Sequence, residues 1–220
     1  MPSMAFGQGT ADAEIRHHDE PRATASKAWW AASGAEESAL TQIRMLNEAL
    51  LAGHSATLVL DAWCAHNGMA QAGAVRVEKI SAGRLARIPT GVHKALAVER
   101  GGDILHRRVR LMCGAHILSE ADNWFVPARV TPAMRDTLAT TDTSFGRVVA
   151  PLNFIRRPLS LRMIATSATI RAAAAQLTGF DLFAHDAVLM LPDGRPLAYV
   201  RETYKSGALS FDKAPDTLSR

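Results

Sequence analysis

The chain has 220 residues, of which 48% are hydrophobic and 21% are charged, which is the composition of an ordinary globular protein. This length suits one domain, or one domain with a tail. The 25 basic and 21 acidic residues give a net charge of +4, which is too small and too evenly mixed to indicate nucleic-acid binding by itself. It does fit a preference for small anions.

Cysteine usage and hydropathy predict a cytoplasmic, soluble chain with no membrane span. Cys64 and Cys113 are the only cysteines, so they can form a single bridge but no disulfide framework. The N-terminal sequence has no basic segment followed by an apolar run, which a signal peptide would have. No apolar run approaches the roughly 20 residues that a membrane-spanning helix needs.

The N-terminal part of the chain predicts a tail followed by a single domain. Residues 1–36 are rich in Ala, Gly, Ser and charge and show no sustained periodicity, so we predict a flexible tail in which Trp29 and Trp30 can act as a docking point. We assign residues 37–220 to one domain.

Two helices are predicted at the start of this domain. Apolar residues recur at helical spacing from Leu40 to Leu51, and Gly53 is placed to end the first helix. Ser55 or Thr57 can cap a second helix, which Gly68 would end.

Strand-like patterns dominate the remainder, in the order 74–81, 104–113, 116–126, 147–157, 161–170, 187–191 and 196–204. A tight Cys-Gly-Ala turn joins the second segment to the third, and Pro-Asp-Gly joins the last two. Helices are predicted at 132–141, with Thr131 as N-cap, and at 172–177. Because the strands follow one another through hairpins, we predict an α+β fold, an antiparallel sheet faced by helices.

In two of the predicted strands, charged residues share a face with apolar residues that are expected to be buried. Arg107 shares one face of its strand with apolar neighbours, whereas Arg108 and Arg110 lie on the other face. Glu202 shares a face with Val200 and other apolar neighbours. A buried carboxylate is unfavourable unless it is paired or hydrogen-bonded, and an arginine is the obvious partner.

Three explanations of this charge remain open at the level of pattern. Arg108 or Arg110 can form a structural ion pair with Glu202, or the sheet face can be open to water. Alternatively, an arginine fork holds a ligand carboxylate while Glu202 holds a ligand hydroxyl.

Other constellations carry weaker signals. Cys113-x-x-His116 offers two metal ligands but no second pair, so we predict no metal site. The basic cluster of Arg156, Arg157 and Arg162 is typical of a solvated strand edge. The sequence contains no P-loop, nucleophile elbow or dinucleotide-binding fingerprint.

A series of short motifs between about Leu46 and Leu209 resembles the chorismate lyase family, whose fold is shared by the ligand-binding domains of certain transcription regulators. The motifs are, in order, Ser55-Ala56-Thr57, RVRLMC at 108–113, Val126-Pro127, SFGR at 144–147 and PLAYVRETY at 196–204. Their order and spacing carry the resemblance. It implies a chorismate-lyase-like sheet covered by helices and helical flaps.

Position by position, the resemblance assigns the carboxylate-binding arginine to Arg108 and the site glutamate to Glu202. Backbone N–H groups of the two flaps fall on Ala56 and on Phe145, beside Gly146. Among the apolar residues, Met112 and Val200 would line the ring of the ligand.

The implied activity is the conversion of chorismate to 4-hydroxybenzoate and pyruvate, which would feed ubiquinone synthesis. Aromatisation drives this elimination, so the protein has mainly to orient the substrate and exclude water, and no metal or organic cofactor is implied. The partner would be a cyclohexadiene or aromatic carboxylate, and the resemblance implies a monomer. The alternative is a non-catalytic small-molecule sensor domain on the same fold.

This sequence departs from the family pattern in its N-terminal tail of roughly 36 residues, which has no counterpart there, and at two single positions. Ala56 replaces a larger apolar residue, which would loosen the lid over the ring. Asp186 stands where the family has basic residues, which puts a second anion contact in doubt.

Overall fold

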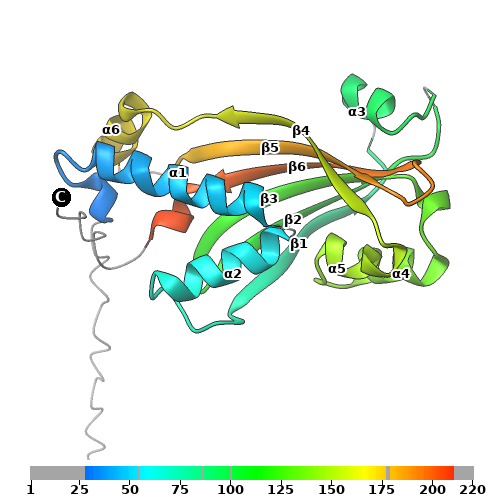
Figure 1. The fold of residues 1–220 in the computed structure, drawn as a ribbon, viewed down its shortest axis with the longest axis horizontal. Helices are drawn as coiled ribbons and strands as arrows, with labels where there is room; N and C mark the ends of the chain where they lie inside the picture. Colours follow the sequence, from blue (N-terminus) through cyan, green and yellow to red (C-terminus); the bar gives the residue numbers. More distant parts are fainter. Residues whose placement is uncertain (1–27, 54, 86, 100, 177–178, 211–220) are drawn as a thin grey trace, which may run out of the picture.

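The computed structural model describes residues 28–53, 55–85, 87–99, 101–176 and 179–210. Its framework is an antiparallel sheet of six strands in the order β1-β2-β3-β6-β5-β4 (Figure 1). The strands are β1 (Val75–Gly83), β2 (Leu105–Cys113), β3 (His116–Phe125), β4 (Ile155–Met163), β5 (Asp181–Met190) and β6 (Pro196–Lys205). The predicted α+β class with an antiparallel sheet is therefore confirmed.

The helices in the described part of the chain lie on both faces of the sheet (Figure 1). They are α1 (Glu36–Ala52), α2 (Ala56–His66), α3 (Thr90–Ala95), α4 (Pro132–Thr140), α5 (Phe145–Val149) and α6 (Ser167–Gln176), with short 3-10 turns at Trp29–Ala31, Pro127–Arg129, Ala150–Leu152 and Ser206–Leu209. The predicted helices that became α1, α2 and α4 are confirmed, and the Thr131 hydroxyl accepts a hydrogen bond from the Met134 N–H as its N-cap.

Hairpins build the two halves of the sheet, and one long-range pairing joins them. β2 pairs with β3, and β5 pairs with β6, as the turn residues predict. The halves meet where β3 pairs with β6, with Asn123 opposite Val200 and Ala121 opposite Glu202. β1 and β4 form the two edges. This topology brings Glu202 to the centre of the sheet.

Three apolar clusters surround the sheet. One packs α1, α2 and α6 against one end of the inner face, including Ile43, Leu60 and Phe183. A second packs α4 and α5 against the other end of the same face, around Phe125 and Val149. The third packs α3 on the outer face. The inner face therefore carries two separate groups of helices, and the space between them is available for a site.

The region between residues 144 and 176 differs from the sequence prediction. The segments 147–157 and 161–170 were predicted as two strands, but the structure has α5, a 3-10 turn, the single strand β4 and then α6. The prediction was wrong because short apolar runs such as Val148-Val149 and Ile164-Ala165 suit a helix packed on a sheet as well as a strand. Residues 172–176 of the predicted helix at 172–177 are part of α6, and residue 177 lies outside the described residues.

Packing extends into the segment that was predicted as a tail. Trp30 and Ala31 are buried, and the Trp29 indole donates a hydrogen bond of 2.8 Å to the Leu209 carbonyl. Residues 28–36 therefore belong to the packed part of the chain, which includes both predicted docking tryptophans. Residues 1–27 lie outside the described residues, so a flexible tail there stays a prediction.

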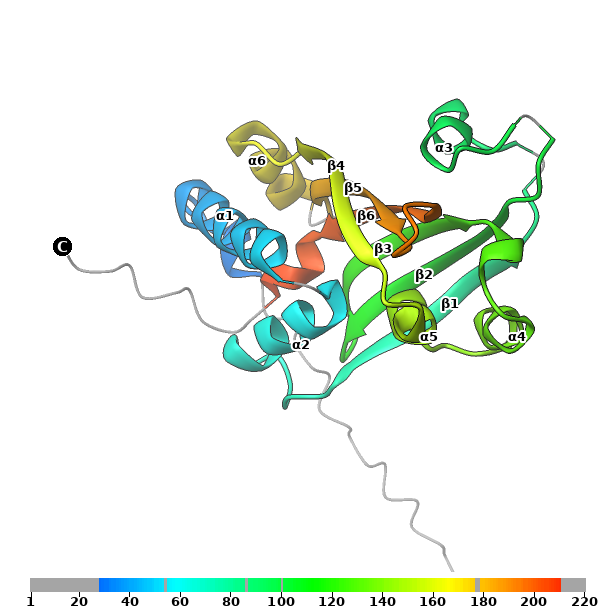
Figure 2. The same ribbon diagram turned by 45° about the vertical axis from the view of Figure 1, so that its right-hand side comes forward.

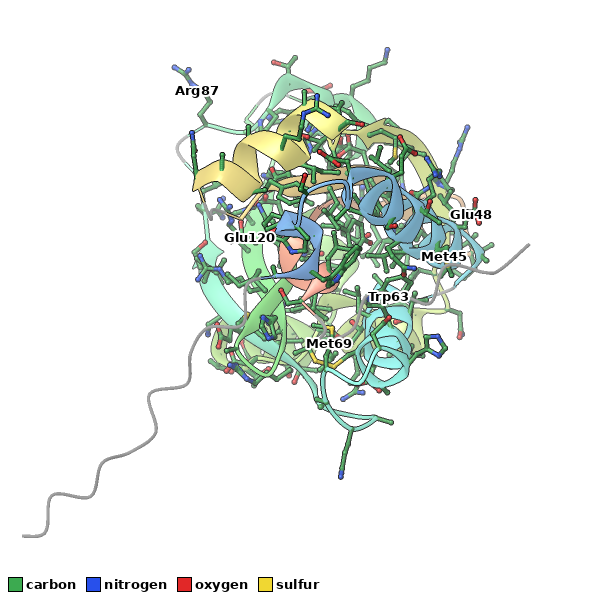
Figure 3. All side chains as sticks on the ribbon, turned by 90° about the vertical axis from the view of Figure 1, so that its left-hand side faces the viewer. Met45, Glu48, Trp63, Met69, Arg87 and Glu120 are labelled. Atoms are coloured by element: carbon green, nitrogen blue, oxygen red, sulfur yellow. A yellow bond between two sulfur atoms is a disulfide. The ribbon has the colours of Figure 1, made fainter. Side chains whose placement is uncertain are left out.

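Cys64 and Cys113 form a disulfide that links α2 to β2 (Figure 3). Both cysteines are fully buried in the cluster beneath α2. The bridge was one of two states that the sequence allowed, and it fixes the helix whose first turn lines the cavity described below. In the part of the chain that the structure describes, no helix is long and apolar enough to span a membrane.

Candidate functional site

A cavity of about 350 Å³ lies on the inner face of the sheet, between the first turns of α2 and α5. We call it the flap cavity; its lining includes Ala56, Asn123, Phe145, Arg156, Val200 and Glu202. Figure 2 shows α2 and α5 on this face, with β4 leading away from α5. Small-ligand sites have volumes of roughly 300–1,000 Å³, so the cavity suits a small molecule.

An ion pair between Arg156 and Glu202 lines this cavity. Nη2 of Arg156 donates a hydrogen bond of 2.7 Å to Oε2 of Glu202, and the two side chains are 26% and 13% exposed. The Tyr204 hydroxyl donates a second bond, of 3.2 Å, to the same oxygen. Burial raises the pKa of the Tyr204 phenol, and the nearby negative charge of Glu202 raises it further. This hydroxyl therefore stays protonated and acts as a hydrogen-bond donor.

The pair leaves hydrogen-bonding groups available to a ligand. Among the described residues, neither Nε nor Nη1 of Arg156 has a hydrogen-bond partner, and neither does Oε1 of Glu202. Asn123 is buried beside them, and its amide makes one long bond of 3.4 Å to the Arg107 carbonyl. The cavity can therefore offer both donors to an anion and acceptors to a hydroxyl group.

Two helix starts border the cavity. Ser55 is the N-cap of α2 and Ser144 precedes α5, and neither side chain makes a capping hydrogen bond. The first N–H groups of α2 are therefore not satisfied by a side-chain cap. Phe145 is buried against Phe125, with ring centroids 5.4 Å apart, which fixes the start of α5.

The structure places the predicted residues in two groups. Ala56, Phe145, Gly146, Val200 and Glu202 all line the flap cavity, as the resemblance implies. Arg108 and Met112 are not part of its lining. The structure therefore brings the predicted residues together in one cavity, except for the two that lie on β2.

The predicted convergence of Arg108 with Glu202 is wrong. Glu202 lies opposite Ala121, which lies opposite Val109, so Arg108 projects from the other face of the sheet. There its Nη2 donates a 2.7 Å bond to Glu120, and this bond raises the pKa of the Arg108 guanidinium. At 44% exposure this is a surface ion pair. Arg108 is one residue away from Val109, which lies in line with Glu202, and this single step puts it on the other face because side chains alternate along a strand.

Arg107, which the sequence places on one face with apolar neighbours, is fully buried on the inner face. Its Nε donates to the Leu138 carbonyl at 3.0 Å, and its Nη2 donates to the carbonyls of Thr141 and Thr143 at 3.0 and 2.8 Å. Burial lowers the pKa of the guanidinium, partly opposed by Asp142. Through these three hydrogen bonds, Arg107 holds in place the segment that leads from α4 to the first turn of α5.

Sequence reasoning missed Arg156, which takes the place beside Glu202 that was predicted for Arg108. In the sequence it forms a basic cluster with Arg157 and Arg162, which is typical of a solvated strand edge. With the observed pairing, Arg156 lies opposite Leu189 and faces the cavity, whereas Arg157 lies opposite Val188 and faces outward. Alternation separates Arg156 from Arg157, but only the pairing of β4 with β5 shows which of the two faces the cavity.

A buried histidine lies next to the ion pair. His185 is opposite Glu202 in the sheet, and its Nε2 is 2.8 Å from Oδ1 of Asn47. Burial, and then the charge of Arg156, lowers the pKa of His185 to about 4. The imidazole is therefore neutral at physiological pH and adds no charge to the site. Asp186, the predicted departure from the family pattern, is bound by Arg201 at 2.7 Å.

The charges that line the flap cavity favour an anion. Arg147 and Arg156 contribute two positive charges, and Glu202 contributes one negative charge. The uncapped first turn of α2 adds a partial positive charge. Within the described residues no group of three His, Cys, Asp or Glu side chains could hold a metal ion, and Cys113 of the Cys113-x-x-His116 motif is in the disulfide.

Comparison with known proteins identifies one related sequence. The uncharacterized protein y4mC of Sinorhizobium fredii is 39% identical over 183 residues, which cover 79% of this chain and 77% of the relative. The chain belongs to the y4mC family. No model of a known protein family matches the sequence.

Among solved structures, members of the GntR family of transcriptional regulators are similar to this y4mC-family chain. The ligand-binding domain of a putative GntR-family regulator from Bordetella bronchiseptica has a TM-score of 0.45 at 18% identity, over 67% of this chain and 92% of that domain. PhnF from Mycobacterium smegmatis has a TM-score of 0.46 at 15% identity, over 65% of this chain and 63% of PhnF.

Proposed function

We propose that this chain is a non-catalytic domain that binds a small organic acid in the flap cavity. The observation that carries the proposal is the Arg156–Glu202 pair, which lines a cavity between two helix starts and keeps free donors and a free acceptor. A ligand carboxylate would bind Nε and Nη1 of Arg156. A ligand hydroxyl would donate to Oε1 of Glu202.

The residues of the site support binding rather than general acid–base chemistry. Arg156 and Glu202 already compensate each other's charge, which suits them to hold the polar groups of a ligand. His185, which lies opposite Glu202 in the sheet, is neutral and hydrogen-bonded to Asn47. The arginine that the lyase resemblance assigned to the substrate, Arg108, is on the other face of the sheet.

Calorimetric titration with 4-hydroxybenzoate tests this proposal. A hydrogen bond to a charged group contributes about 1.5–3 kcal/mol, so Arg156→Gln should weaken binding by about tenfold to a hundredfold. Arg157→Gln is the matched control, because it removes the same charge from the neighbouring residue on the outer face. Equal affinities for the parent and both variants would contradict the assignment of Arg156, and thermal melts would confirm that each variant is folded.

A second candidate is the chorismate lyase reaction that the resemblance implies. It is favoured by the free Oε1 of Glu202, which could hold the ring hydroxyl of chorismate, with Arg156 in the role first assigned to Arg108. Incubation with chorismate should then release 4-hydroxybenzoate and pyruvate in equal amounts. Product formation that is lost in Arg156→Gln and kept in Arg108→Gln would establish catalysis in this cavity, whereas tight binding without product supports the binding function.

A further inference from the structure

A second hollow, of about 690 Å³, adjoins the flap cavity. It lies between the C-terminal end of α1 and the edge strand β4, and we call it the β4 groove. Its apolar lining includes Leu51, Ile155, Leu159 and Leu161. Phe154 and Arg156 line both the groove and the flap cavity, so the two spaces meet at these residues.

Exposed apolar side chains concentrate in this groove. Nine large hydrophobic side chains in the described part of the chain are exposed, and four of them line the β4 groove: Leu51, Ile155, Leu159 and Leu161. Single exposed apolar residues are ordinary, but a contiguous apolar group beside a polar pocket marks a binding groove. The four side chains come from two elements, α1 and β4, that are far apart in the sequence.

Of the polar residues that line the groove, Arg156 alone is charged and keeps free hydrogen-bonding groups among the described residues. His185 is uncharged and bound to Asn47. The carboxylate of Asp186 is compensated by Arg201 and also accepts a bond from Ser160. Arg156 is thus the charged lining residue with free hydrogen-bonding groups, and it stands where the groove meets the flap cavity.

We propose that the β4 groove binds the aliphatic chain of a ligand whose carboxylate is held by Arg156, so that the ligand class is an amphipathic monocarboxylic acid. This inference rests on the proposed binding function and names the ligand class for the same site. The chain would lie on Leu159 and Leu161 of β4 and be covered by Leu51 of α1.

Charge disfavours a second copy of this chain as the occupant. Two β4 edges that paired in antiparallel fashion would bring together Arg156, Arg157 and Arg162 from each copy. Like charges on paired strands are destabilising, whereas a single carboxylate complements this cluster.

The test is calorimetric titration with butanoate, hexanoate and octanoate below their micelle concentrations. Each buried methylene should tighten binding by about fourfold, so octanoate should bind more than about a hundredfold better than butanoate. Leu161→Asp should abolish this dependence on chain length. Ile80→Asp is the matched control, because Ile80 and Leu161 are both 43% exposed on opposite edge strands.

The outcomes separate this inference from the proposed function. Binding of butanoate and octanoate with equal affinity overturns the groove and keeps the acid site. Octanoate binding that depends on Leu161 but is unchanged in Arg156→Gln supports the groove and overturns the acid site. If none of the three aliphatic acids binds, the inference is overturned, and the titration with 4-hydroxybenzoate decides separately whether the proposed function stands. A dimer in sedimentation velocity that is lost in Leu161→Asp, without acid binding, identifies the groove as an interface between copies and overturns the inference.

Discussion

Replacement of Arg107 by methionine should destabilise the fold by about 3 kcal/mol, whereas the same replacement at Arg108 should have little effect. Arg107 is fully buried and donates to three backbone carbonyls between Leu138 and Thr143. Arg108 is 44% exposed and makes a surface ion pair with Glu120. The two arginines are adjacent in sequence and differ in the face that they occupy.

The magnitude follows from the hydrogen bonds that are lost. A hydrogen bond to a charged group contributes about 1.5–3 kcal/mol to the stability of the folded state. Arg107 is itself desolvated, and its Nη1 has no hydrogen-bond partner among the described residues, which offsets part of this gain. Taking about 1 kcal/mol for each of the three bonds gives a loss near 3 kcal/mol. An exposed ion pair contributes about 0–1 kcal/mol, so Arg108→Met should change little.

Urea denaturation of the parent, Arg107→Met and Arg108→Met measures both effects. The midpoint should fall clearly for Arg107→Met while the slope stays constant, because the same surface is exposed on unfolding. Arg107→Met should also weaken acid binding in the flap cavity, since the tethered segment leads to Phe145. If the two variants are equally stable, the burial and the bonds of Arg107 do not hold that segment, and the reasoning fails.

Two further predictions concern His185 and the disulfide. The pKa of His185 is lowered from 6.5 to about 4, so below pH 6.5 the unfolded chain binds a proton that the folded chain does not, and stability should fall by about 3 kcal/mol in total as the pH drops to about 4. His185→Gln should remove this part of the pH dependence in denaturation curves; an unchanged profile would contradict a neutral buried imidazole. Reduction of Cys64–Cys113, which are separated by 49 residues, should cost about 4 kcal/mol by the loop-entropy relation, measured as the loss of stability in dithiothreitol and compared with the Cys64→Ala/Cys113→Ala variant. Free thiols titrated in the unreduced, unfolded protein would show that the bridge is absent.

The local sequence pattern was sufficient to predict features that depend on a single strand, turn or helix. Alternation placed Arg107 and Arg108 on opposite faces and put Glu202 with apolar neighbours, because side chains in a strand alternate whatever the partner strand is. Turn residues similarly predicted both hairpins, and Thr131 marked the start of α4. The motif resemblance added four further residues that line the flap cavity: Ala56, Phe145, Gly146 and Val200.

The sequence could not show which arginine meets Glu202, because that depends on long-range pairing. Only the tertiary structure, through the pairing of β3 with β6 and of β4 with β5, brings Glu202 next to Arg156 and leaves Arg108 on the outer face. The strand phase of residues 147–163 was equally undetermined, since short apolar runs fit a helix or a strand until the neighbouring elements are placed. Residue types and their periodicity thus fixed the faces, and contacts between distant segments decided which faces share a cavity.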